Sequence, residues 1–170
     1  MAQTIPLRIV SIVPSVTEML FAVGAGPAVI GVGNFDRFPP EAATRTKVGG
    51  LIDPDIERII SLKPDLVVVY GTQSDLRTQM ERAGIPIFLY QHSGLTDITS
   101  TIRDLGARVG HVRESRELAD RIESDIADVR KRVAGRTRPR TMLVFGRDAE
   151  TLRGIYASGG IGFLHDMLEA

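Results

Sequence analysis

Cysteine is absent from this 170-residue chain, and its absence limits the chemistry that the chain can support. Without cysteine there is no disulfide, no thiolate metal site and no cysteine nucleophile. Basic and acidic side chains are equal in number, 21 of each, so the formal net charge is zero. Because nucleic-acid-binding proteins usually present a basic face, this balance argues against a nucleic acid partner.

Long apolar runs and the common catalytic motifs are also missing. No stretch approaches the roughly 20 apolar residues that a membrane-spanning helix requires. The first seven residues lack the basic start and apolar core of a secretory signal, so we expect no export signal within the chain. Neither G-x-S-x-G nor H-E-x-x-H is present, and neither is a G-x-G-x-x-G or P-loop motif. These absences weaken an enzymatic or nucleotide-binding interpretation and indicate no intrinsic cofactor.

The stretch from residue 7 to residue 26 is the one around which the chain is organised. Residues 7–13 are almost all apolar, which predicts a strand buried on both faces. Pro14 ends that strand, because proline cannot donate to a strand ladder. Ser15, with Glu18 three residues later, has the spacing of a capping box and predicts the N-cap of a helix.

Strands and helices then alternate along the chain. Asp53 is predicted to cap a helix whose first residue is Pro54, after a loop over residues 33–50. Each predicted strand is nearly all apolar, which is typical of an α/β fold with a doubly wound parallel sheet. The further predicted strands cover residues 28–32, 66–70 and 85–90, and the further helices residues 74–83 and 95–109.

A long helix interrupts this alternation over residues 114–134, where five apolar residues follow one stripe. Short strands at 141–145 and 155–157 and a helix at 162–169 are predicted after it. We therefore expect an N-terminal α/β lobe in residues 1–112, a linking helix in 113–135 and the start of a second, incomplete α/β lobe in 136–170. An incomplete lobe would expose apolar surface, so we also expect that two copies of the chain could dimerise through it.

Four segments together resemble the class III periplasmic binding proteins, and in particular their cobalamin-binding branch. The segments are RIVSIVPSVTEMLFAVGAG, VIGVGNFDRFPPEA, KVGGLIDPDIERIISLKPDLVVVY and GIPIFLY. These proteins are the substrate-binding components of ABC importers for cobalamin, ferric siderophores and haem. The resemblance implies two lobes with the ligand between them, a membrane permease as partner, a periplasmic or other extracytoplasmic location and no enzymatic activity. Members of the family usually exceed 170 residues.

The resemblance also implies positions for the ligand-binding residues. Pro14 and Ser15 match a segment of the cleft wall. Phe35 falls where cobalamin binders have an aromatic residue that contacts the corrin, and Phe38 matches the neighbouring aromatic residue. Leu51 falls where the cobalamin type has a tryptophan, a residue that this chain lacks altogether.

Three more candidates lie at or just after the ends of predicted strands, and one lies on a helix. Tyr70, Gln91 and His92 are at the carboxyl ends of strands, where open α/β sheets bind ligands. Tyr70 or His92 could also serve as an axial ligand of haem iron. Glu57 matches the surface glutamate through which the N-terminal lobe docks on the permease.

Two other interpretations of the sequence stay open. The first is a cofactor- or nucleotide-handling enzyme on a Rossmann-like scaffold, which a response to NAD or ATP would reveal. The second is an interaction module that uses the first lobe alone. It predicts a stable fold up to about residue 134 with no response to small molecules.

Overall fold

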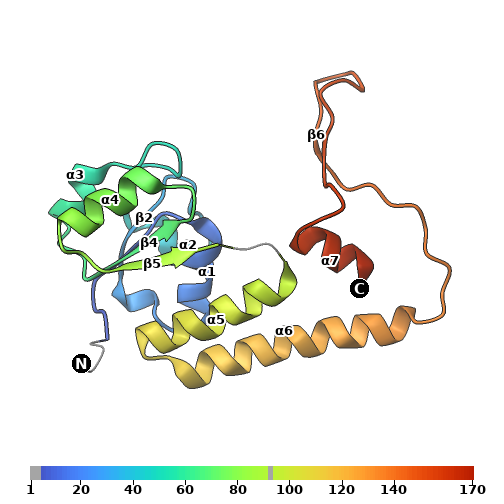
Figure 1. Cartoon of the computed structure of the whole chain (residues 1–170), viewed down its shortest axis with the longest axis horizontal. Coiled ribbons are helices and arrows are strands. Elements are labelled where there is room, and N and C mark those ends of the chain that lie inside the picture. Colours follow the sequence, from blue (N-terminus) through green and yellow to red (C-terminus); the bar gives the residue numbers. More distant parts are fainter. Residues whose placement is uncertain (1–4, 92–93) are drawn as a thin grey trace. The chain divides into compact units, whose positions relative to one another are not determined.

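A five-stranded parallel sheet forms the centre of the N-terminal part of the chain, in a computed structural model that describes residues 5–91 and 94–170 (Figure 1). The strand order is β3-β2-β1-β4-β5, and every pairing in the sheet is parallel. The predicted α/β fold with a parallel sheet is therefore confirmed. The strands are β1 (Ile9–Ser11), β2 (Val29–Val32), β3 (Thr46–Lys47), β4 (Leu66–Tyr70) and β5 (Ile87–Tyr90).

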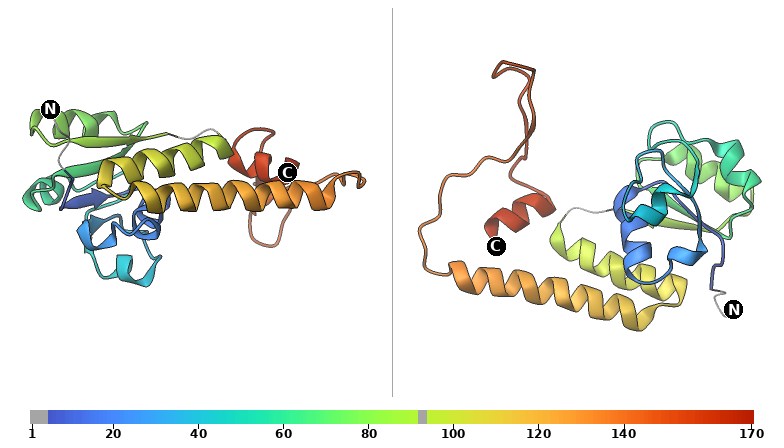
Figure 2. Two further views of the ribbon diagram at one scale, coloured as in Figure 1. Left: turned by 90° about the horizontal axis from the view of Figure 1, so that it is seen from below. Right: turned by 180° about the vertical axis from the view of Figure 1, so that it is seen from behind.

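Helices cover both faces of this sheet, which explains the apolar strand sequences. The α3 and α4 helices lie on one face and α1 on the other (Figures 1 and 2). The first four residues of β4 are fully buried, as expected for a strand with neighbours on both edges and cover on both faces. The helices are α1 (Pro14–Ala22), α3 (Ile56–Ser61), α4 (Ser74–Arg82) and α5 (Leu95–Val109).

The start of α1 differs from the predicted one. The helix begins at Pro14, Val13 is its N-cap and no side chain caps it, so the prediction of Ser15 as the cap was wrong. Proline suits the first helical position because its fixed φ matches the helix and its missing N–H would have no helical partner. The Val13 carbonyl instead accepts from the amides of Val16 and Thr17, both at 2.9 Å.

The start of α3 was also predicted wrongly. Its N-cap is Asp55, whose carboxylate accepts from the Arg58 amide at 2.9 Å. Asp53 lies in a turn before the helix, where its carbonyl accepts from Gly50 N at 3.2 Å. Pro54 forms an isolated bridge with Gly49, so the backbone stays extended past Pro54 and the helix begins two residues later than the sequence pattern suggested.

The predicted loop over residues 33–50 contains two short elements. A single helical turn, α2 (Pro40–Ala43), and the edge strand β3 lie within it. Neither element is long enough to show a helical or alternating apolar period, so the sequence pattern could not reveal them. A short 3-10 helix, η1 (Gly26–Ala28), leads into β2.

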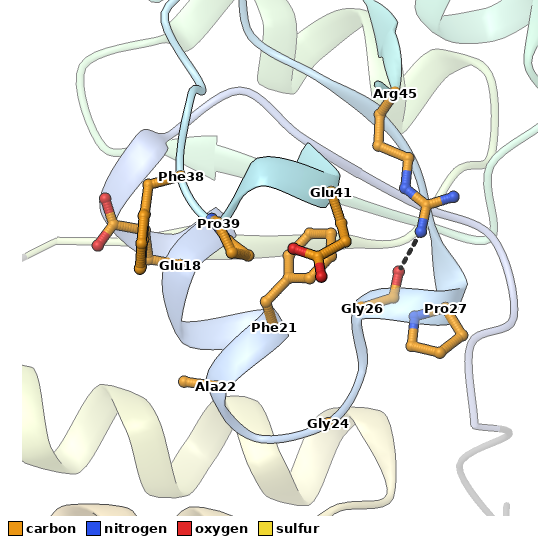
Figure 3. Close-up of a pocket in the computed structure, with 10 residues that line it drawn as sticks. All are labelled: Glu18, Phe21, Ala22, Gly24, Gly26, Pro27, Phe38, Pro39, Glu41 and Arg45. Atoms are coloured by element: carbon orange, nitrogen blue, oxygen red, sulfur yellow. Dashed lines mark hydrogen bonds between the residues drawn. The ribbon is translucent and has the colours of Figure 1, made fainter. Parts of the chain in front are cut away.

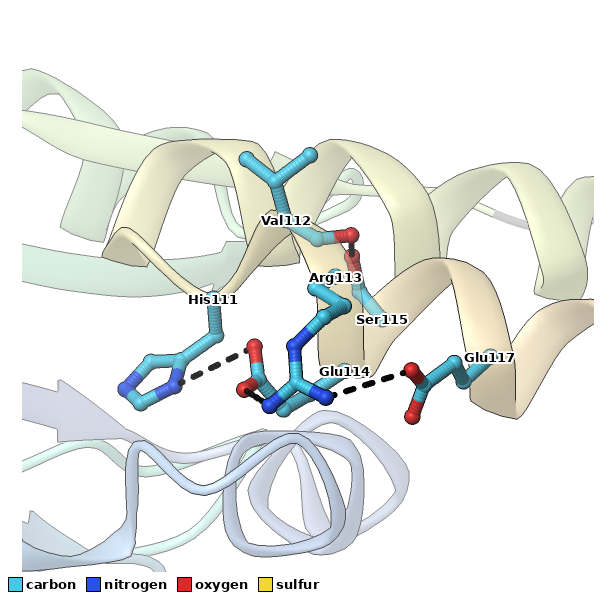
Figure 4. A network of polar contacts seen from close by, with 6 residues as sticks. All are labelled: His111, Val112, Arg113, Glu114, Ser115 and Glu117. Carbon is cyan, nitrogen blue, oxygen red and sulfur yellow. Dashed lines mark hydrogen bonds and ion pairs between the residues drawn. The ribbon is translucent and has the colours of Figure 1, made fainter.

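The predicted long helix is confirmed as α6 (Val112–Val133), and charged residues surround its first turn. Arg113 pairs with Glu114 at 2.9 Å and with Glu117 at 3.4 Å, and His111 Nδ1 lies 4.0 Å from Glu114 (Figure 4). The backbone amide of Glu114 holds the pKa of its carboxyl below the usual value, and Arg113 and His111 act in the same direction. An acidic residue here also suits the positive end of the helix dipole.

The described residues separate into two compact units. The first unit holds the described residues up to Gln91 together with Thr101–Leu118, and the second holds those between Gln91 and Thr101 together with Ala119–Ala170. The second unit contains a two-stranded antiparallel sheet of β6 (Val144–Gly146) and β7 (Tyr156–Ala157), followed by α7 (Phe163–Glu169). Among the described residues, no helix combines the length and apolar character needed to cross a membrane.

Candidate functional site

Loops that follow β1, β2 and β3 enclose a cavity of about 550 Å³, which we call the edge cavity. Because the strands are parallel, these loops meet at the carboxyl edge of the sheet, where open α/β sheets bind ligands. The lining is mostly apolar, with a few polar groups from the backbone and from short side chains. It consists of Ile12, Pro14, Gly33, Asn34, Phe35, Asp36, Gly50, Leu51, Ile52 and Asp53.

Phe35 lies in a tight turn after β2, formed by residues 33–36 and called the Phe35 turn below. The turn closes through a hydrogen bond from Asp36 N to Gly33 O at 3.2 Å. Phe35 is 72% exposed although it borders the cavity, and a Cβ atom placed on Gly50 would lie 3.6 Å from its ring. An exposed aromatic ring at the mouth of an apolar cavity can stack on a flat ligand.

Another part of the lining is the turn after β3, which carries Leu51 and Ile52. Leu51 is 40% exposed and Ile52 is 98% exposed. The buried amide of Gln73 fixes this turn, because Gln73 Nε2 donates to Leu51 O at 2.7 Å. The other end of the same amide, Gln73 Oε1, accepts from Tyr70 N at 2.9 Å. Gln73 therefore ties the end of β4 to the wall of the edge cavity.

Asp36 is a buried acid at the base of the Phe35 turn, with 1% of its surface exposed. Neither carboxylate oxygen has a hydrogen-bond partner of good geometry within the described part of the chain. Burial raises the pKa of the Asp36 carboxyl, and the nearby Thr17 hydroxyl, the Lys47 ammonium and backbone amides lower it in part. Lys47 donates to backbone carbonyls rather than to this carboxylate.

The structure brings three of the predicted ligand-binding residues together. Pro14, Phe35 and Leu51 all line the edge cavity. Ser15 is exposed in the first turn of α1 and does not line that cavity. His92 lies outside the described residues.

Tyr70 is the last residue of β4 and Gln91 directly follows β5, so both lie at carboxyl ends of strands, as predicted. The Tyr70 ring packs against Tyr90 with 5.8 Å between the ring centroids. A Cβ atom on Gly71 would lie 2.5 Å from the Gln91 side-chain nitrogen, so the two loop starts touch. Gly71 thus allows the close approach of the Gln91 side chain.

Phe38 lies in a second cavity, of about 480 Å³, formed by α1, η1 and α2 (Figure 3). The floor of this second cavity is the Phe21 ring, with the Arg45 guanidinium carbon 5.9 Å from the ring centroid. Arg45 Nη2 donates to Gly26 O at 3.3 Å. The carboxylates of Glu18 and Glu41 also border it. The structure therefore separates Phe38 from Phe35, although only two residues lie between them.

Asp36 and Lys47 are among the residues that shape the edge cavity but were not predicted as site residues. Asp36 was missed because an acidic residue in a Gly- and Pro-containing loop is usually solvated. Lys47 was missed because nothing in the sequence indicates that its ammonium group reaches back to the preceding loop. Among residues 5–91 and 94–170, no group of three or more His, Asp or Glu side chains could hold a metal ion.

Comparison with known proteins gives a consistent result. The sequence pattern of the periplasmic binding protein family matches residues 9–170. An uncharacterised ABC transporter substrate-binding lipoprotein of Bacillus subtilis is 29% identical over 168 residues, which is 96% of this chain and 53% of the relative. The vitamin B12-binding protein of Pectobacterium atrosepticum is 31% identical over 152 residues, which is 85% of this chain and 54% of the relative.

A solved structure agrees with the sequence relatives. The periplasmic haem-binding protein of Roseiflexus sp. RS-1 superposes with a TM-score of 0.72 at 27% identity, and the match covers 85% of this chain and 57% of that protein. The present chain spans about half the length of the curated relatives it matches.

Proposed function

This chain belongs to the periplasmic binding protein family, and we propose that it acts as the substrate-binding component of an ABC importer. Family membership indicates an extracytoplasmic location, and we propose a periplasmic or cell-surface site of action. The partner would be a membrane permease that receives the ligand. Its task would be recognition and delivery, with no covalent chemistry.

The observation that carries this proposal is the edge cavity itself. It unites Pro14, Phe35 and Leu51 at the carboxyl edge of a parallel sheet. Apolar and aromatic surface supplies most of the affinity in such sites, and a few polar groups orient the ligand. This chemistry suits a bulky, partly flat molecule better than a small ion or a nucleotide.

We propose a cobalamin-like corrinoid as the ligand, with haem and ferric siderophores as the other members of the class. The corrinoid is supported by the name of the relative at 31% identity, and haem by that of the solved structure at 27%. In each case the metal would arrive inside its own chelate and would count as cargo. Tyr70 and Gln91 stay candidates for further ligand contacts at the same sheet edge, and His92 stays a candidate on the sequence alone.

We also propose that Glu57 docks the protein on the permease. Glu57 is exposed in the first turn of α3, on the side away from the buried Ile59. A carboxylate in this position can pair with an arginine of a partner without the cost of removing it from a buried contact. Charge reversal by Glu57→Lys should therefore reduce transport while leaving ligand affinity unchanged.

The direct test is a binding panel on the purified chain. Cyanocobalamin, cobinamide, haem, a ferric siderophore, NAD and ATP are each titrated while the melting temperature is followed. A ligand that binds only the native state raises the melting temperature. At a ligand concentration of a hundred times Kd, it increases the free energy of unfolding by about 2.7 kcal/mol. A response to a corrinoid, haem or siderophore supports the proposal, and a response to NAD or ATP alone contradicts it.

Two phenylalanines provide a matched pair for locating the bound ligand. Phe35 and Phe38 are 72% and 63% exposed, but only Phe35 lines the edge cavity. We expect Phe35→Ala to weaken binding by about tenfold, since a stacked aromatic contributes on the order of 1 kcal/mol beyond its buried area. Phe38→Ala should have the smaller effect. The reverse order would place the ligand in the second cavity.

A further inference from the structure

The first two residues of the Phe35 turn are hydrogen-bonded to neighbouring segments of the chain, one at the end of β1 and one just after β3. Gly33 N donates to Ser11 O, at the end of β1, at 3.1 Å. Asn34 N donates to Gly49 O, beyond β3, at 2.8 Å. These two bonds hold the first half of the turn but leave Phe35 itself, and the residue after it, to be fixed by other contacts.

Lys47 adds further contacts to the Asp36 N to Gly33 O hydrogen bond that closes the turn. It is the last residue of β3, and its side chain is only partly exposed. Lys47 Nζ donates to Gly33 O at 3.2 Å and to Asp36 O at 2.8 Å. One ammonium group thus joins the first and last carbonyls of the turn, with Asn34 and Phe35 between them. Hydrogen bonds from a charged donor are stronger than neutral ones, so this bridge is a strong local restraint.

The side chain of Asp36 favours the same arrangement. Its carboxyl group is buried beside the turn, so close to Gly33 that a Cβ atom there would lie 2.7 Å from Asp36 Oδ2. The Lys47 ammonium is the nearby positive charge that acts on this carboxyl. Lys47 therefore compensates a buried acid and bridges two carbonyls at one point, the base of the Phe35 turn.

We propose that Lys47 is a positioning residue for the ligand: by bridging Gly33 O and Asp36 O it holds the Phe35 ring at the mouth of the edge cavity before any ligand arrives. This inference rests on the proposed function insofar as the ring is a ligand contact. The advantage is preorganisation. A ring that is already fixed need not lose its freedom on binding, and ordering an interface side chain costs about 0.5–1.5 kcal/mol.

Backbone mobility tests the restraint without any ligand. ¹⁵N relaxation is measured on the whole chain as wild type and as Lys47→Met, Lys47→Gln and Lys47→Arg. Lys63→Met is the matched control, because Lys63 is exposed and no polar contact of its ammonium group is observed in the described residues. We expect the order parameter of the Phe35 amide to fall from about 0.85 to below about 0.6 in Lys47→Met. Lys47→Arg should retain most of the restraint, and Lys63→Met should change nothing.

An unchanged order parameter in a folded Lys47→Met protein would overturn the proposal. If Lys47→Met does not fold, Lys47→Gln decides, because it removes the charge but keeps an NH₂ donor. An order parameter for Lys47→Gln equal to that of wild type overturns the proposal, and a lower one supports it.

A double-mutant cycle of ligand affinities tests whether Lys47 affects binding through Phe35. Cyanocobalamin affinity is measured for wild type, Lys47→Met, Phe35→Ala and the double variant. We expect Lys47→Met to weaken binding by about tenfold, and to have less than about a twofold effect once Phe35 is removed, because residues that act through one another are not additive. Equal effects in both backgrounds would show that Lys47 does not act through Phe35. If wild type binds none of the panel ligands, the proposed function fails, while the relaxation experiment still decides whether Lys47 restrains the turn.

Discussion

The two sheets of this protein contain similar strand sequences in very different surroundings. β4 reads LVVVY, and its first four residues are buried. β6 reads VFG, and all three residues are exposed. β4 pairs with β1 and β5, whereas β6 pairs within the described structure with β7 alone. An apolar run therefore predicts that a strand forms, but its neighbours decide how much that strand contributes to stability.

The same contrast extends beyond the strands. Apolar side chains after α6 are far more exposed than those of the five-stranded sheet, for example Leu152 at 81% and Ile161 at 86%. Exposed apolar surface of this kind is typical of an interaction site. The expectation that two copies of the chain dimerise through this region stays a prediction, which light scattering over a range of concentrations can check.

The largest expected effect is the difference in stability lost when a large apolar side chain is truncated in each of the two sheets. Leu66→Ala, at a fully buried position of β4, should reduce the free energy of unfolding by about 2–5 kcal/mol, because it leaves a cavity in the core. Phe145→Ala in β6 should reduce it by about 1 kcal/mol or less, since Phe145 is 49% exposed and its ring packs against the exposed Tyr156. Urea denaturation followed by circular dichroism measures both. Equal losses would show that β6 is as well packed as β4.

Sequence reasoning succeeded where the pattern is long and regular. The bounds of β4 and α5 were predicted to the residue, because an uninterrupted apolar run and a 15-residue helical period leave little choice. The long α6 helix was placed within two residues at its start and one at its end. The parallel sheet followed from the alternation of these elements.

It failed where two local signals competed. At α1 the proline that ends the strand is also the first residue of the helix, so the capping-box spacing of Ser15 and Glu18 misplaced the helix start. At α3 the pair Asp53 and Pro54 looked like a cap and a first helical residue, but Pro54 forms a bridge with Gly49, and the N-cap is Asp55 with the helix beginning at Ile56. Tertiary pairing, which no sequence window contains, decided the second case.

For the candidate site, the sequence identified residues but not how they are supported. Phe35 and Leu51 were predicted, and they do line one cavity. The groups that hold them, Lys47 for the first and Gln73 for the second, act through hydrogen bonds to backbone carbonyls 11 and 22 residues away. Such contacts have no sequence signature.

A smaller difference in stability is expected when glycines with positive φ are replaced by alanine, one in the first unit and one just after α6. Gly49 has a φ of +88°, and a Cβ atom there would lie 2.6 Å from Asp55 N and 2.9 Å from Pro54 Cα. Gly135, just after α6, has a φ of +75°, but a Cβ atom there would meet nothing within 4 Å in the described part of the chain. Gly49→Ala should therefore cost about 2–3 kcal/mol, from strain and a backbone clash, and Gly135→Ala about 1 kcal/mol from φ alone. Thermal unfolding of both variants checks the difference, and equal costs would mean that the bridge beside Gly49 yields easily.

The smallest expected effect concerns the buried charge of the first unit. Asp36 is the one charged side chain that is buried among the described residues, and burial raises its pKa above 3.8. Below pH 3.8 the carboxyl is protonated in both the folded and the unfolded protein. As the pH rises, the unfolded chain ionises first, so the wild type loses stability until the pH passes the raised pKa of the folded state.

Asp36→Asn removes this titration while keeping the shape of the side chain. The melting temperature of the variant minus that of the wild type should therefore increase with pH from about 3.8 upward and then level off once the pH passes the raised pKa of the folded state. Melting curves in a pH series measure it. A difference that falls as pH rises would mean that the ionised carboxylate is stabilised in the fold, and Lys47 would then contribute more through Asp36 than through the two carbonyls.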